Sequence, residues 1–208
     1  MASLIEEGEH ETQDFKFAIT DSRKIARSIS AFANHSGGRL LVGVKDNGIV
    51  AGVRNEEDIY MVEQAAQVFC IPPQSLKVDA FKVQGGKLVL RVEIARCDNP
   101  PVMVREADGH LKAYFRVADE NIAAHPLMVR AWKQASSGEG GAFALDDLGR
   151  TLLELASAPG GIEPEQIMLS AHVSRSRAED AIVNLVAMNL LEFKYSGGVF
   201  KLSCREGV

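Results

Sequence analysis

Apolar residues recur at spacings of three and four in several segments, which is the period of a helix with one buried face. In residues 21–36 they form a single stripe, which Thr20 or Asp21 can cap and Gly37 and Gly38 end. Further helices are predicted for residues 56–69, 122–134, 146–158, 163–171 and 174–190. These helices are separated by segments with a different period.

The intervening segments alternate apolar and polar residues, which is typical of half-buried strands. Strands are predicted for residues 39–44, 49–53, 76–83, 87–95, 102–105 and 112–117, and the chain ends in a hairpin over residues 191–203. Asp46-Asn47-Gly48 supplies the turn of a hairpin between the first two strands. The pattern predicts an α/β (α+β) fold, with a mixed, mainly antiparallel sheet flanked by helices.

A Gly- and Ser-rich stretch without large apolar residues divides the chain after the third predicted helix. We expect a first domain over residues 1–134, a flexible linker over 135–142 and a second domain over 143–208. In the second domain three helices precede a two-stranded hairpin. That order is typical of a small winged helix-turn-helix domain.

The composition places the chain among folded proteins, because 46% of its residues are hydrophobic and 25% are charged. The N-terminus is acidic and no apolar run is long enough for a spanning helix, so we expect a cytoplasmic protein without membrane association. The three cysteines are widely separated, which excludes a disulfide framework or a CxxC zinc site. We expect Cys70 to be a small buried hydrophobe.

The net charge of −5 excludes a protein whose whole surface is built to hold a polyanion. Up to Lys133 the chain has 17 Lys and Arg against 18 Asp and Glu, and beyond it 6 against 10. Any nucleic-acid face must therefore be local.

Three motifs follow one another in the first domain: EHETQDFK at residues 9–16, AFANHSGGRLLVGVKDNG at 31–48 and AYFRVADENIAA at 113–124. Together they resemble the Schlafen AlbA-like DNA-binding domain family over most of residues 7–132. Within the central motif, we expect Asn34, Gly37, Gly38, Gly43 and Gly48 to have a structural role. The glycines suit the turns that this motif must form, since glycine adopts left-handed backbone conformations without steric cost and permits another backbone segment to approach closely.

The same resemblance implies a nuclease alternative. Glu9, Asp14 and Asp46 fall at the positions of three acidic residues that form a metal-dependent RNA-cleaving site in nuclease members of the group. Convergent carboxylates can hold Mg²⁺ or Mn²⁺, and Lys16 lies on the same strand face as Asp14, where it can meet a phosphate. The family usually has Glu where Asp14 stands, however, and a solvated acidic N-terminus and a hairpin turn explain these acids equally well.

Several cations are candidate nucleic-acid contacts. Arg175 and Arg177 lie in the first turn of the predicted third helix of the second domain, where helix-turn-helix proteins contact the major groove. The remaining candidates are Lys194 and Lys201 on the terminal hairpin, and Arg39, Lys45 and Arg54 near the glycine-rich loop of the first domain. No GxxxxGK[ST], HExxH or GxSxG motif is present, which excludes the corresponding catalytic classes.

We therefore predict a DNA-binding protein of the transcriptional-regulator type, with DNA favoured over RNA and no cofactor. Two alternatives stay open. The first is a metal-dependent endoribonuclease that uses the three carboxylates with Mg²⁺ or Mn²⁺. The second is a protein–protein adaptor whose winged helix forms a homodimer. Whether the chain is an enzyme is left open, with a non-enzymatic role favoured.

Overall fold

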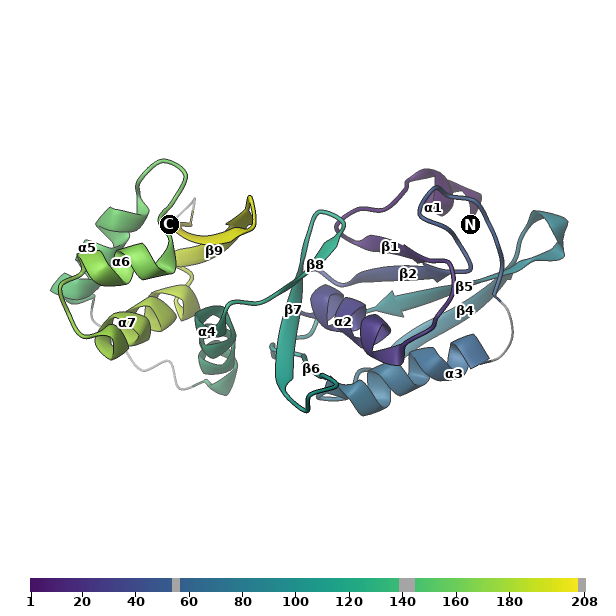
Figure 1. The fold of residues 1–208 in the computed structure, drawn as a ribbon, viewed down its shortest axis with the longest axis horizontal. Helices are drawn as coiled ribbons and strands as arrows, with labels where there is room; N and C mark the ends of the chain where they lie inside the picture. The colour runs from purple at the N-terminus through teal and green to yellow at the C-terminus, as the bar shows by residue number, and fades with distance from the viewer. Residues whose placement is uncertain (54–56, 139–144, 206–208) are drawn as a thin grey trace. The chain divides into compact units, whose positions relative to one another are not determined.

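The computed structural model describes residues 1–53, 57–138 and 145–205. The chain divides into two compact units, Met1–Ala124 and His125–Val208 (Figure 1). None of the helices in the described ranges combines the length and the apolar character needed to cross a bilayer.

Two four-stranded sheets form in the described part of the first unit. The first has the order β1 (Gln13–Lys16), β2 (Gly38–Val42), β5 (Leu88–Ile94), β4 (Leu76–Lys82), and the second β3 (Cys70–Ile71), β6 (Met103–Arg105), β7 (Leu111–Val117), β8 (Glu120–Ala123). Strands β1 and β2 are parallel, whereas all the other neighbours are antiparallel. The predicted mixed, mainly antiparallel fold is confirmed.

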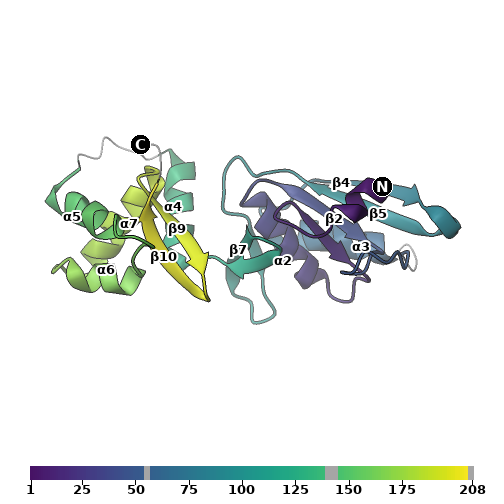
Figure 2. The same cartoon turned by 90° about the horizontal axis from the view of Figure 1, so that it is seen from above.

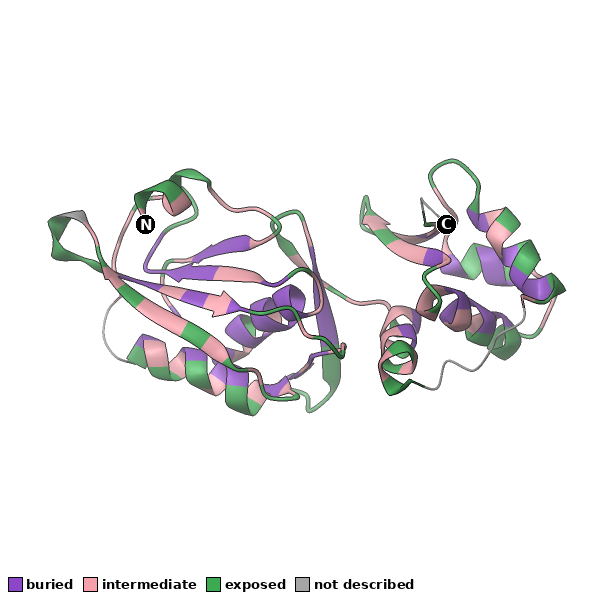
Figure 3. Ribbon diagram, turned by 180° about the vertical axis from the view of Figure 1, so that it is seen from behind, coloured by how far each residue is buried: buried purple, intermediate pink, exposed green. Residues whose placement is uncertain are grey.

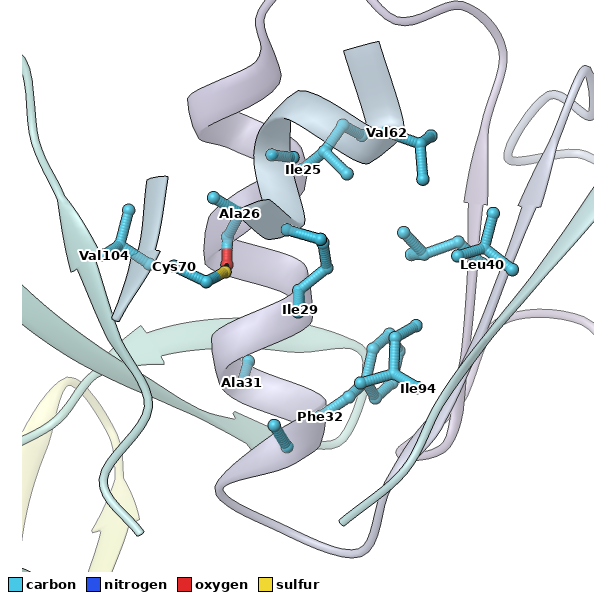
Figure 4. Packing of buried hydrophobic residues seen from close by; sticks show 14 of the residues in the cluster. Ile25, Ala26, Ile29, Ala31, Phe32, Leu40, Val62, Cys70, Ile94 and Val104 are labelled. Carbon is cyan, nitrogen blue, oxygen red and sulfur yellow. Dashed lines mark hydrogen bonds between the residues drawn. The ribbon is translucent and has the colours of Figure 1, made fainter. Parts of the chain in front are cut away.

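Helix α2 (Ser22–Ala33) packs between the two sheets and is buried along most of its length (Figure 3). Leu40 and Ile94 of the first sheet lie on one side of it, and Cys70 and Val104 on the other (Figure 4). Cys70 is 1% exposed, and burial raises the pKa of its thiol to about 12, so it is the small buried hydrophobe that the sequence predicted. The described part of the unit also contains α1 (Ala2–Glu6), the short 3₁₀ helix η2 (Gln84–Gly86) and α3 (Glu57–Gln64), which continues as the π-helical turn η1 (Ala65–Phe69).

The turn after α2 depends on glycine, as the sequence predicted. Gly37 has a φ of +74°, and its amide donates to the carbonyl of Phe32 at 2.8 Å, which closes the helix. A Cβ on Gly43 would lie 2.8 Å from the backbone of Gly52, so only glycine permits these two segments to touch.

The predicted hairpin over residues 39–53 is wrong in its second strand. The turn forms, because the Gly48 amide donates to the Lys45 carbonyl at 2.7 Å. Beyond it only a single bridge joins Val44 and Val50, and β2 pairs with β1 and β5 instead. The strand stops because Gly43 and Gly52 take positive φ values and the chain folds back onto itself between them.

The predicted helix over residues 122–134 is also corrected. Residues 120–123 form β8, and α4 (Pro126–Ser137) begins at Pro126, which suits the first helical position. Its apolar residues Leu127 and Ala131 belong to the core of the second unit, so α4 does not close the first domain. Of the predicted linker, residues 135–137 are helical, and 139–142 lie outside the described residues.

The second unit continues with α5 (Asp147–Ala156), α6 (Pro164–Ser170) and α7 (Arg175–Ala187), followed by β9 (Leu191–Ser196) and β10 (Val199–Cys204). The two strands form an antiparallel hairpin (Figure 2), as predicted. Leu152, Ile167, Ile182 and Leu202 bring the three helices and the hairpin into one core. This core shares no residue with the clusters of the first unit.

Candidate functional site

Polar side chains from the first and third sequence motifs, together with Ser28 of α2, form one hydrogen-bonded network in the first unit. Arg116 of β7 is at its centre and is 1% exposed. Its guanidinium donates to the Asn121 side-chain oxygen and to the His10 carbonyl, both at 2.9 Å. The guanidinium carbon also lies 4.7 Å from the centre of the Phe32 ring, a cation–π contact.

The network extends from Asn121 to the first motif. The Asn121 amide donates to Ser28 Oγ at 2.9 Å, and the Ser28 hydroxyl donates to Asp14 Oδ2 at 3.4 Å. Lys16 Nζ lies 2.7 Å from the same carboxylate oxygen. We call Arg116, Asn121, Ser28, Asp14, Lys16 and Glu9 the motif network, because it joins β7 and β8 to α2 and β1.

Two carboxyl groups meet in the motif network. The Phe15 amide donates to Glu9 Oε1 at 2.8 Å, and the Glu9 and Asp14 side chains are hydrogen-bonded to one another. Burial and the hydrogen bond to Asp14 raise the pKa of Glu9 to about 7, so Glu9 carries the shared proton in mildly acidic solution. Burial lowers the pKa of Arg116, against the opposing effect of the Asp14 charge.

The third predicted metal ligand does not join this pair. Asp46 lies on the exposed turn after β2. Across residues 1–53, 57–138 and 145–205, no group of three or more His, Cys, Asp or Glu side chains is placed to hold a metal ion. Asp14 is moreover neutralised by Lys16, which the sequence had assigned to a phosphate. The residues do not fit the implied metal site, and we derive no step through a metal.

Asn34 of the central motif connects the end of α2 with the backbone of the second sheet. Its amide nitrogen donates to the carbonyls of Val102 and Tyr114, both at 2.9 Å, and its oxygen accepts from the Val102 amide at 2.7 Å. Because these backbone groups of Val102 and Tyr114 would otherwise be buried without partners, Asn34 holds the second sheet against the end of α2.

The cations predicted in the first unit lie in different surroundings. Arg39 donates to Gln13 and pairs with Glu7 at 2.6 Å. Lys45 Nζ lies 5.3 Å from the centre of the Phe17 ring. Arg54 falls outside the described residues. The structure therefore brings neither Arg39 nor Lys45 into the motif network.

The cations predicted on α7 are exposed, and each has an acidic partner. Ser174 caps the helix by accepting from the Arg177 amide. Arg175 is 75% exposed and pairs with Glu179 at 2.8 Å, and Arg177 is 66% exposed and lies 3.9 Å from Asp146. These side chains share the first turn of one helix, as predicted.

The two hairpin lysines are direct neighbours. Lys194 and Lys201 stand opposite one another in the register of β9 and β10, on the face away from the core residue Leu202. Lys194 Nζ lies 3.0 Å from Glu192, whereas Lys201 forms no ion pair with any residue of the described ranges.

Sequence reasoning missed Arg116, Ser28 and Asn121 as individual residues. For Arg116 the sequence did contain a signal, because this arginine stands between the apolar strand residues Phe115 and Val117. A buried arginine requires hydrogen-bond acceptors nearby. Ser28 carried no signal, since a serine within a helix is ordinary.

Two solved structures and one protein-family model are similar to this chain. The chain is 19% identical to the DIP2311 protein from Corynebacterium diphtheriae, with a TM-score of 0.49 over 92% of this chain and 34% of that one. It is 19% identical to the N-terminal domain of an ATP-dependent DNA helicase RecG-related protein from Nitrosomonas europaea, with a TM-score of 0.41 over 60% of this chain and 94% of that one. This chain thus spans about a third of the length of the DIP2311 protein.

No protein of curated function matches the sequence. The family described as Schlafen, AlbA_2 matches residues 9–125, which is more than half of the chain and includes all three motifs. The protein therefore belongs to the Schlafen AlbA_2 family.

Proposed function

We propose that this protein binds duplex DNA as a regulator of the transcriptional type, and that its second unit is a winged helix-turn-helix. The observation that supports this best is the junction of α6 and α7. Four residues, 171–174, join the two helices, and His172 takes a φ of +51°, which lets the chain reverse tightly. The hairpin that follows α7 corresponds to the wing.

The exposed first turn of α7 supports its role as the DNA-reading helix. Arg175 and Arg177 are the side chains that would contact bases or phosphates there. Their pairs with Glu179 and Asp146 are exposed, and such pairs contribute about 0–1 kcal/mol. Contacts to DNA phosphates gain in addition from the release of condensed counterions, which favours exchange of partner despite the acidic neighbours.

Fluorescence anisotropy with a labelled duplex tests the proposal. Binding is expected to weaken steeply between 50 and 200 mM NaCl, on the order of 10³-fold for several phosphate contacts. The double variant Arg175→Ala, Arg177→Ala should bind about tenfold or more weakly, and its salt slope should fall by about 2. Arg150→Ala is the matched control, because Arg150 is also exposed and paired but lies on α5.

This experiment, an RNA cleavage assay and a measurement of oligomeric state together separate the alternatives. Absence of binding at 50 mM NaCl, or equal binding by the double variant and the control, would exclude the proposal. Cleavage of a labelled RNA in Mg²⁺ or Mn²⁺ would favour the endoribonuclease instead. A stable homodimer that binds neither polymer would favour the adaptor.

A further inference from the structure

A pocket lies between the loop that follows α5 and the outer face of the terminal hairpin. Its lining includes the Gly160–Gly161 turn and the polar residues Ser157, Lys194, Ser196, Lys201 and Ser203. Its volume is about 540 Å³, within the range of roughly 300–1,000 Å³ that is usual for small-molecule sites. None of these residues belongs to α7, so the pocket is separate from the proposed DNA-reading helix.

The loop is fixed tightly against β10. The Ile162 amide donates to the Leu202 carbonyl at 2.9 Å, and the Leu202 amide donates back at 2.7 Å. Gly161 has a φ of +71°, and a Cβ there would lie 2.7 Å from the Leu202 oxygen. The wall of the pocket is therefore rigid, because only glycine permits this approach.

The pocket concentrates positive charge on an acidic protein. Lys194 and Lys201 are paired directly opposite one another, an arrangement that destabilises a hairpin when both are charged. Glu192 lies beside Lys194, but no carboxylate is among the lining residues. An anion between the two ammonium groups would relieve their repulsion.

A buried hydroxyl adds an independent indication. Ser203 Oγ is shielded from solvent and has no hydrogen-bond partner in the described part of the protein. Buried polar atoms without partners are rare and costly. Ser203 lines the pocket, so rotation about its Cα–Cβ bond would turn the hydroxyl toward a ligand oxygen there.

We propose that the pocket binds a phosphate group, either of a free phosphate ester or of a polynucleotide backbone. Lys194 and Lys201 supply charge, and the hydroxyls of Ser196 and Ser203 supply hydrogen bonds to the phosphate oxygens. The Gly160–Gly161 turn keeps side chains out of the space above them.

Titration of the full chain with inorganic phosphate tests this site directly. Amide NMR shifts of Gly160, Gly161 and Ser203 should saturate together in the wild-type protein. The double variant Lys194→Gln, Lys201→Gln should bind phosphate about tenfold or more weakly. Lys24→Gln is the control, because Lys24 is an exposed lysine on α2 and should leave the titration unchanged.

Ser203→Ala gives a second readout that does not depend on charge. It should weaken phosphate binding without lowering the thermal midpoint of the ligand-free protein, since it removes a hydroxyl that has no partner. Shifts that fail to saturate, or that saturate equally in the double lysine variant, would overturn the proposal.

Two further binding measurements identify the source of the phosphate. If the pocket takes a polynucleotide backbone, inorganic phosphate should compete with a labelled duplex at constant ionic strength, and the lysine variant should weaken duplex binding. If it takes a free ester, a nucleoside monophosphate should saturate the same amides while duplex binding is unchanged. The phosphate titration does not involve Arg175 or Arg177, so its outcome is distinguishable from that of the DNA-binding test.

Discussion

At the scale of single residues, the first unit depends on an arginine that satisfies acceptors from three segments. Arg116 reaches the side chain of Asn121 and the carbonyls of His10 and Gln13. A planar guanidinium can serve these directions at once, whereas an ammonium is a single point donor. The residue therefore fixes β1, β7 and β8 relative to one another as well as balancing the charge of Asp14.

We predict that Arg116→Lys destabilises the first unit by about 3 kcal/mol, because it leaves buried acceptors without partners. Urea unfolding followed by circular dichroism measures the loss. Arg105→Lys is the control, since Arg105 is exposed on β6. A cost below about 1 kcal/mol would mean that solvent, and not Arg116, satisfies these carbonyls.

Local patterns predicted some residues of the candidate site and missed others for a physical reason. Glu9, Asp14 and Lys16 are close in sequence, and they meet in the structure. Asp46 is separated from them by a whole helix and strand, and its place depends on how the loop after β2 folds back. Spacing along a chain does not determine such a long-range position.

At the scale of elements, periodicity predicted α2, the β4–β5 pair and the terminal hairpin, because each is fixed by its own apolar pattern and turn residues. It missed the parallel pairing of β1 with β2 and the strand nature of residues 120–123, because sheet partners are remote in sequence. It also assigned α4 to the wrong unit. The apolar face of α4 indicates burial but does not specify which core receives it.

Helix α4 is held at its start by one aromatic side chain. His125 Nδ1 accepts from the Leu127 amide at 3.2 Å, and its ring stacks on Phe193 with centroids 5.1 Å apart. The hydrogen bond caps α4, and the ring stack connects the beginning of α4 with the hairpin.

We predict that His125→Asn costs about 1 kcal/mol, because asparagine can still cap the helix but loses the ring stack. His125→Ala should cost about 2 kcal/mol, since it loses both contacts. Thermal unfolding followed by Trp132 fluorescence measures these effects, and equal costs for the two variants would show that the cap contributes nothing. Trp132 is the chain's single tryptophan and belongs to α4, so its signal reports on the second unit.

At the scale of the whole molecule, the two units have separate cores and opposite responses to pH. Burial and Asp14 raise the pKa of Glu9 to about 7 from 4.5, so the folded first unit binds this proton more tightly and loses stability as pH rises through that window. Burial lowers the pKa of His125 below its usual 6.5, so the unfolded second unit binds that proton more tightly. The second unit therefore loses stability as pH falls below about 6.5.

We predict that lowering the pH from about 7.5 to about 5.5 stabilises the first unit, by roughly 1 kcal/mol after solvent screening, and destabilises the second. Hydrogen exchange of the α2 amides follows the first unit, and Trp132 fluorescence follows the second. Glu9→Gln should remove the first response and His125→Asn the second, while each leaves the other intact, because the two groups belong to different units. A common shift of both probes in one direction would mean that the units unfold together, and would contradict their independence.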